Sequence, residues 1–258
     1  MASPRADQLA CLCLVLLLGA ACGGADKRDN LTTGDAARRA YEDALVDYQS
    51  GDCVEAEPLL REVRRQYPFT RFAALAELKL ADCLFEEDKY IEAISGYRQF
   101  IRQRPSHVEV PYAQLMIAKA SYEQIPSDWL LAPPSHERDQ ASTESTLNEL
   151  QTFLRLYPQD PRVAEAKQLL QHARDLLARR ELYVADFYRG REHPEAAVGR
   201  LRNLLSAYAG SSLEPQALYM LGEVYADMKQ TDASQKAFRE LVTRFPKSEE
   251  AESARSSL

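Results

Sequence analysis

The sequence predicts an all-α protein, a superhelical solenoid of about five repeats in which each repeat is a hairpin of two helices. Two observations support this fold class. Only 10 of the 258 residues are glycine, while strong helix formers such as alanine, leucine, glutamate and arginine are abundant. In addition, one kind of helix end recurs along the chain, with small and aromatic residues at matching distances from it. An irregular helical bundle would not explain this regularity.

Each of these recurring ends closes a helix that contains arginine, and the residue that stops the helix is proline or glycine. Proline cannot donate the next helical hydrogen bond, and it pushes the residue before it out of the α region. Glycine is the other common residue at helix ends. The stops fall at residues 68, 105, 158, 209 and 246, which gives spacings of 37, 53, 51 and 37. They are Tyr67-Pro68, Arg104-Pro105, Tyr157-Pro158, Tyr208-Ala209-Gly210 and Phe245-Pro246.

Between the stops, small residues alternate with large apolar ones at fixed offsets. Small residues let the two helices of a hairpin approach closely, and aromatic rings fill the space to the next hairpin. A period in the thirties with paired helices is the tetratricopeptide signature. Repeat two carries Ala81, Asp88, Tyr90, Ala93, Tyr97, Phe100 and Pro105, and repeat five carries Leu221, Gly222, Tyr225, Ser234, Phe238, Leu241 and Pro246.

These signals divide the chain into regions. Residues 1–21 are predicted to be a signal peptide, 22–34 a lipidated cysteine and tether, 35–158 repeats one to three, and 159–258 repeats four and five with a capping helix. In repeat three, helices at about 110–124 and 140–157 flank a proline-rich insert that contains Trp129. Repeat four begins with a long helix at about 161–189, and the capping helix starts near Ser248.

The N-terminus predicts where the protein goes. A short apolar run follows Arg5 and ends in Gly19-Ala20-Ala21, which indicates a cleaved secretory signal. Cys22 comes next and resembles the lipidated cysteine of a bacterial lipobox, although Leu18 lies four places before it rather than three. In lipoprotein families, Gly23 in place of aspartate implies transport to the outer membrane. The alternative is ordinary cleavage after Ala21, which would leave a free periplasmic protein.

Composition argues against several classes of function. A net charge of −7 without a basic run is unsuited to nucleic acid. The four histidines are scattered, no nucleotide-binding or hydrolase motif occurs, and we expect no catalytic residue, metal or cofactor. Cys53 and Cys83 are predicted to be buried free thiols, with a disulfide as the alternative.

The chain as a whole resembles the BamD family, the lipoproteins of the outer-membrane β-barrel assembly machinery. The resemblance covers the lipobox, the short tether and five repeats with an insert in the third. Local matches are Arg138-Asp139-Gln140, Leu156-Tyr157-Pro158 and the run from Glu181 to Tyr188. It implies a binding protein at the periplasmic face of the outer membrane, lipid-anchored through Cys22. The rival interpretation is another periplasmic tetratricopeptide lipoprotein, such as one that coordinates envelope constriction or peptidoglycan synthesis.

The resemblance also implies partners. The N-terminal repeats would bind unfolded outer-membrane protein precursors. The C-terminal repeats would dock the periplasmic domains of the barrel-forming subunit, and other assembly lipoproteins would join the complex. By alignment, the family's coupling arginine falls on Arg200, while an aromatic residue of the family is replaced near Pro194.

Candidate precursor contacts lie on or near the first helices of repeats one to three, where each could equally be packing between repeats. They are Tyr41, Tyr48, Arg71, Phe72, Tyr112 and Tyr122. Arg138 and Asp139 could contact a partner or pair with each other within their loop.

Overall fold

The computed structural model describes residues 32–126 and 140–258, and within these residues all regular structure is helical. Within each of these two ranges, consecutive helices are joined by short connections, as the repeat pattern predicts. The eleven helices of these two ranges are α2 (Thr33–Gln49), α3 (Cys53–Gln66), α4 (Arg71–Glu86), α5 (Tyr90–Gln103), α6 (Val110–Glu123), α7 (Ala141–Leu156), α8 (Val163–Gly190), α9 (Pro194–Ala207), α10 (Glu214–Asp227), α11 (Thr231–Arg244) and α12 (Glu249–Arg255). Helix α2 begins within the last two residues of the predicted tether.

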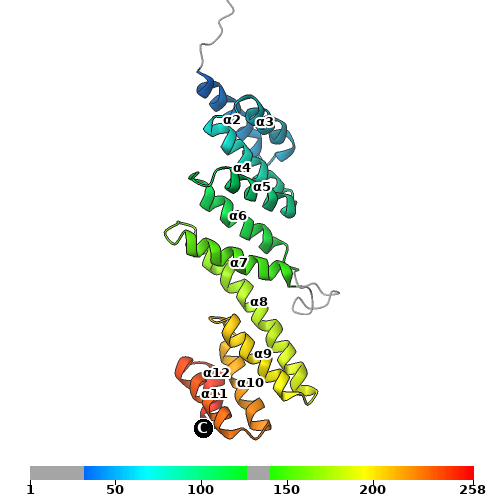
Figure 1. Cartoon of the computed structure of the whole chain (residues 1–258), viewed down its shortest axis with the longest axis vertical. Coiled ribbons are helices and arrows are strands. Elements are labelled where there is room, and N and C mark those ends of the chain that lie inside the picture. Colours follow the sequence, from blue (N-terminus) through cyan, green and yellow to red (C-terminus); the bar gives the residue numbers. More distant parts are fainter. Residues whose placement is uncertain (1–31, 127–139) are drawn as a thin grey trace, which may run out of the picture.

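The helices stack in chain order into an elongated rod (Figure 1). Each packs mainly on its neighbours in the sequence, and α2 also touches α4, α6 touches α8 and α10 touches α12. We call α2, α4, α6, α8 and α10 the A helices and α3, α5, α7, α9 and α11 the B helices of repeats one to five. The loops from a B helix to the next A helix lie along the left edge in Figure 1, and the turns within repeats one, two, four and five lie along the right.

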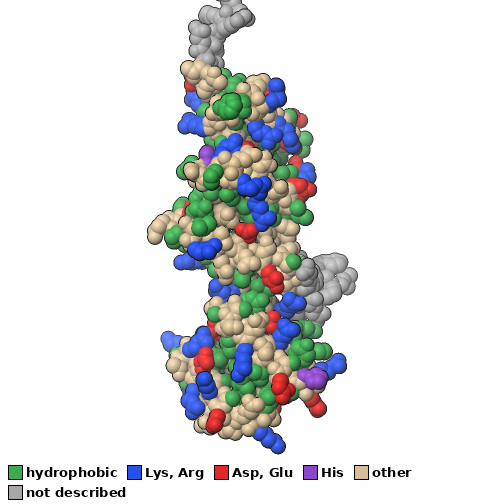
Figure 2. Space-filling model, in the orientation of Figure 1, with side chains coloured by type: hydrophobic (Ala, Val, Ile, Leu, Met, Phe, Trp, Pro, Cys, Tyr) green, Lys and Arg blue, Asp and Glu red, His purple; other side chains and the backbone are tan. Residues whose placement is uncertain are grey.

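On the face drawn in Figure 2, acidic and basic side chains are interspersed with small apolar patches along the whole stack. Within the described residues, no helix has both the length and the apolar character needed to cross a membrane.

All five predicted helix stops are confirmed. The helices end at the residue before the C-caps Tyr67, Arg104, Tyr157, Tyr208 and Phe245. Tyr67 has φ −125° and ψ 50°, and Phe245 has φ −129° and ψ 55°, which is the departure from the α region that a following proline imposes. Several helices also begin with a side-chain N-cap. Thr32, Thr70 and Ser248 each accept a hydrogen bond from a first-turn amide.

The sequence also anticipated the unusual helix lengths. Helix α8 runs for 28 residues, close to the predicted range, and its turn contains Glu192 with a left-handed φ of 60°. Its first half packs into one core and its second half into another. Ala166, Leu170 and Leu177 join residues of α6 and α7, whereas Leu182 and Ala185 join residues of α9 and α10. One continuous helix therefore connects the two halves of the stack.

Small residues set the spacing within hairpins. Gly222 on α10 faces the ring of Phe238 on α11, and a β-carbon at position 222 would overlap that ring. The Ser234 hydroxyl donates a hydrogen bond of 2.8 Å to the Gly222 carbonyl across the same contact. The expected pairing of small and large residues in repeat five is therefore a direct packing constraint.

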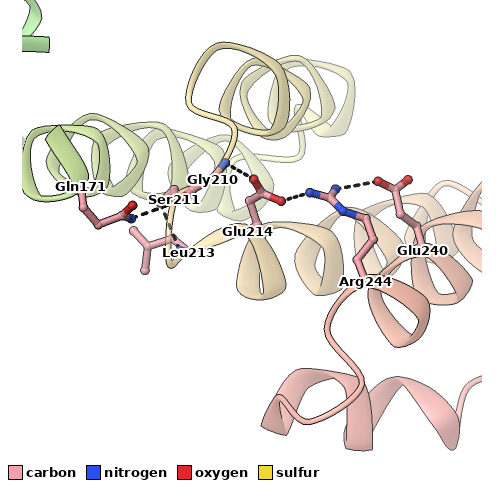
Figure 3. A network of polar contacts seen from close by, with 7 residues as sticks. All are labelled: Gln171, Gly210, Ser211, Leu213, Glu214, Glu240 and Arg244. Atoms are coloured by element: carbon pink, nitrogen blue, oxygen red, sulfur yellow. Dashed lines mark hydrogen bonds and ion pairs between the residues drawn. The ribbon is translucent and has the colours of Figure 1, made fainter. Parts of the chain in front are cut away.

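Polar side chains fix the junction between repeats four and five (Figure 3). Gln171 on α8 donates to the Gly210 carbonyl at 3.0 Å, and the Gly210 amide donates to Glu214. Glu214 is only 1% exposed and is paired with Arg244 at the end of α11. These contacts connect α8, α10 and α11 through the loop between α9 and α10.

Asp175, one turn after Gln171, holds the other side of this loop. Its carboxylate accepts hydrogen bonds from the Ser211 hydroxyl at 2.7 Å and from the amide and hydroxyl of Ser212 at 2.8 and 2.9 Å. Burial opposes ionisation of Asp175, but these hydrogen bonds outweigh it and hold its pKa below the ordinary value.

We predict that Gly222→Ala destabilises the protein by about 2 kcal/mol or more, because the Phe238 ring has no room for the methyl group. Gly199→Ala is the matched control: Gly199 lies in α9 with nothing within 4 Å of its added β-carbon. That change should stabilise by about 0.5–1 kcal/mol, since alanine favours helix. Urea unfolding measures both, and equal effects would contradict the packing constraint.

We predict that Asp175 makes the stability of the folded protein depend on pH. Because its pKa is lower in the folded than in the unfolded protein, its contribution is present above the unfolded pKa of about 3.9 and is lost as pH falls through the folded pKa. Asp175→Asn should therefore lower the melting temperature at pH 7, and the gap to the unmodified protein should close in acid. Asp186→Asn, at an exposed position on the same helix, is the control. A gap that stays constant with pH would contradict the assignment.

Candidate partner-binding surface

The centre of the N-terminal repeats is a buried aspartate shared by three helices. Asp82 on α4 is 2% exposed. It accepts hydrogen bonds from the hydroxyls of Tyr97 on α5 at 2.7 Å and of Tyr112 on α6 at 3.0 Å. Lys79, one turn earlier on α4, places its ammonium 2.7 Å from the other carboxylate oxygen. One carboxylate oxygen therefore accepts from two neutral hydroxyls and the other from a charged ammonium, so both oxygens have a donor, as a buried acid requires.

Aromatic rings and cations extend this cluster across the A helices. The Lys79 ammonium lies 4.6 Å from the ring centre of Tyr48 on α2 and 5.9 Å from that of Tyr112. The guanidinium of Arg162, just before α8, lies 5.5 Å from the centre of the Tyr112 ring. Asp160 binds Arg162 through two bonds of 2.7 Å, which holds the guanidinium in place. We call Tyr48, Lys79, Asp82, Tyr97, Tyr112 and Arg162 the central cluster.

The environment keeps the tyrosines of the central cluster neutral. Burial raises the pKa of Tyr97 and of Tyr112, and the negative charge of Asp82 raises both further. Their hydroxyls thus remain hydrogen-bond donors at any physiological pH. The bonds from Arg162 lower the pKa of Asp160, so that this ion pair also persists.

A second cluster lies at the start of the stack. The ring of Tyr41 on α2 is 5.8 Å from that of Phe72 at the start of α4, and the Arg71 guanidinium lies 4.8 Å from the Phe72 ring. Tyr41 itself is 6% exposed, and burial raises its pKa to about 12. Arg71 is exposed and Phe72 half-buried, so these two form the accessible part of this aromatic cluster.

The structure therefore brings together five of the six predicted precursor contacts, in two clusters. Tyr41 acts mainly in packing. The sixth residue, Tyr122, lies apart on α6, where its ring makes an edge contact with His172 of α8 at 5.6 Å. The predicted sites Cys22, Arg138 and Asp139 lie outside the described residues, as does Trp129.

Lys79, Asp82 and Arg162 were not anticipated from the sequence. A signal for two of them was present: Lys79 and Asp82 are spaced three apart in an otherwise apolar stretch of α4. A lysine and an aspartate at that spacing lie on the same helix face and can pair. Nothing local marks Arg162, because its aromatic partner is fifty residues earlier in the chain.

Arg200 on α9 makes a contact within the chain. Its guanidinium lies 3.5 Å from the carboxylate of Glu181 on α8, which is 7% exposed. The side chain of Arg200 is itself 46% exposed. It thus neutralises a buried acid from one side and leaves the other side of its guanidinium open to solvent.

Cys53 and Cys83 are free and buried, in agreement with the preferred interpretation of the sequence. Burial raises the pKa of both thiols, which keeps them protonated and unreactive. The part of the chain that the structure describes contains no group of three or more acidic, histidine or cysteine side chains that could hold a metal.

Comparison with known proteins gives one family match. Residues 34–238 match the model of the family YfiO, described as outer membrane lipoprotein. The chain is 26% identical to the outer membrane protein assembly factor BamD of Xylella fastidiosa strain 9a5c, over 86% of this chain and 76% of that protein. It is 27% identical to BamD of Caulobacter vibrioides, over 82% of this chain and 67% of that one.

Among solved structures, the chain is similar to a thermophilic tetratricopeptide protein of Thermus thermophilus. The sequence identity is 16%, the TM-score is 0.36, and the match covers 86% of this chain and 97% of the other. A TM-score this low carries no argument about function.

Proposed function

Because this chain belongs to the YfiO family of outer membrane lipoproteins, we propose that it acts in the assembly of outer-membrane proteins, as a binding scaffold rather than an enzyme. The curated relatives, named as outer membrane protein assembly factor BamD, support this role over most of the chain. Cys22 carries lipid and holds the stack at the periplasmic face of the outer membrane.

The N-terminal repeats bind the C-terminal segment of unfolded barrel precursors. The observation that carries this proposal is the central cluster, in which buried Asp82 fixes Lys79 and Tyr112 and so presents a prearranged aromatic and cationic surface. Side chains that are already ordered lose little entropy when a flexible peptide binds. Tyrosine and arginine offer apolar area and hydrogen-bonding groups together, which suits an aromatic peptide end.

The C-terminal repeats dock the periplasmic domains of the barrel-forming subunit, and other assembly lipoproteins join the complex. Arg200 supports this part of the proposal. Glu181 holds its guanidinium from behind, and the exposed side can bind a carboxylate of a partner.

For the precursor site, we predict that Arg71→Ala combined with Tyr48→Leu weakens binding of a synthetic precursor C-terminal peptide by about tenfold, since exposed stacking and charge contacts of this kind each contribute about 0.5–1 kcal/mol. Arg102→Ala, at an exposed position on the B helix α5, is the matched control. Fluorescence anisotropy measures the affinities. An unchanged affinity in the double variant would show that the peptide does not bind at these clusters.

For the docking site, we predict that Arg200→Gln lowers recovery of the barrel-forming subunit with the tagged protein from detergent-solubilised envelopes. The substitution is chosen over charge reversal, which would place a second acid beside Glu181. Adding Glu181→Gln should not restore recovery, because the lost contact is with the partner. Arg239→Gln on α11 is the control for loss of an exposed charge.

Restored recovery in the double variant would show that Arg200 only neutralises Glu181. If the unmodified protein recovers no barrel protein with periplasmic domains, docking itself is contradicted.

A further inference from the structure

The first repeat has opposite charges at its two edges. Helices α2 and α3 form a hairpin, so residues 33–42 and 58–71 share the edge where α4 begins, and residues 43–57 surround the turn at the other edge. Residues 43–57 contain five acidic and no basic side chains, a net charge of −5. The edge formed by 33–42 and 58–71 contains six arginines and three acids, a net charge of +3.

We call these six arginines the basic edge: Arg38, Arg39, Arg61, Arg64, Arg65 and Arg71. All six side chains are exposed. Some are paired locally, as Arg61 is with Glu57 and Arg38 with Asp35 at 3.8 Å. Such exposed pairs are weak, so the field beyond the edge follows the net charge.

An exposed aromatic side chain lies on the same edge. Phe69, in the turn between α3 and α4, is 101% exposed and follows exposed Pro68. Arg64 lies in the last turn of α3 on one side of it, and Arg71 begins α4 on the other. A fully exposed phenylalanine flanked by arginines is typical of protein surfaces that insert into a lipid headgroup layer.

The chain places this edge near a bilayer. Helix α2 begins at Thr33, at the upper end of the stack in Figure 1 and on the basic edge. Thr32 is ten residues after Cys22. Ten residues span at most about 35 Å, so a lipid on Cys22 keeps the start of α2, which lies on the basic edge, within that distance of the membrane surface. This proximity rests on the proposed lipidation of Cys22.

We propose that the basic edge of repeat one, with Phe69, binds the surface of a bilayer that contains anionic phospholipids. The arginines lie against phosphate groups and the Phe69 ring enters the headgroup layer. The acidic edge, at the other end of the same two helices, faces away from the membrane because like charges repel. This second contact orients the rod, which attachment at Cys22 alone cannot do.

The test uses the mature full-length chain with Cys22→Ala, so that no acyl chain contributes. Its sedimentation with vesicles of phosphatidylethanolamine and phosphatidylglycerol is compared with vesicles of phosphatidylcholine alone. We expect a preference for the anionic vesicles that falls with added salt. Arg38→Gln, Arg64→Gln and Phe69→Ser together should weaken this binding by about tenfold or more, because each arginine near an anionic surface contributes about fivefold.

The matched control is Arg239→Gln with Lys247→Gln, which removes two exposed charges from the other end of the stack. Circular dichroism checks that each variant is folded. The proposal is overturned if the parent Cys22→Ala protein shows no preference for anionic vesicles. It is also overturned if the triple variant binds these vesicles as well as the parent does, or if the control variant loses as much vesicle binding as the triple variant. Arg71 is left unchanged because it also belongs to the aromatic cluster proposed for precursors.

Peptide binding by the same variants, measured without vesicles, separates this proposal from the proposed function. Loss of vesicle binding with intact peptide binding confirms a distinct membrane contact. If the peptide does not bind but the vesicles do, the precursor role alone is contradicted.

Discussion

Close packing of each helix on its neighbours in the sequence is the constraint on which the rest of this structure depends. A single hairpin has too little apolar surface to be stable alone, so each repeat must bury its faces against the next. This requires small residues where two helices approach, as Gly222 does beneath the ring of Phe238. The core is accordingly a series of clusters along the rod rather than one centre.

Helix α8 is what makes two groups of repeats one body. It contributes Leu170 and Leu177 to the core of repeat three and Leu182 to the core of repeats four and five. A helix of 28 residues is about 42 Å long and resists bending because its backbone hydrogen bonds are continuous. A precursor on the N-terminal clusters and a partner near Arg200 would therefore be held at a defined separation.

Buried acids fix how neighbouring helices meet. Asp82, Glu181 and Glu214 each lie on an A helix, and each finds a cation, on its own helix for Asp82 and on the following B helix for the other two. A buried carboxylate without a partner is costly, so these contacts restrict the arrangements that the helices can adopt. They also hold Lys79 and Arg200 at the surface in fixed positions. The same contacts thus serve stability and the presentation of the proposed binding groups.

The sequence by itself determined the helical class, the positions of the helix ends and the family. Proline acts locally, on its own residue and the one before it, so the helix ends at Tyr67 and Phe245 could be predicted from the neighbouring residues alone. The resemblance to the BamD family, based on the lipobox and the repeats, is confirmed by the family match over residues 34–238. Only the tertiary structure decided which polar residues meet. Tyr97 and Tyr112 reach the Lys79–Asp82 pair from two other helices, Arg162 reaches the Tyr112 ring from the segment before α8, and Glu181 reaches Arg200 from the preceding helix. Such contacts depend on how far each hairpin rotates against the next, and that angle results from packing summed over many side chains.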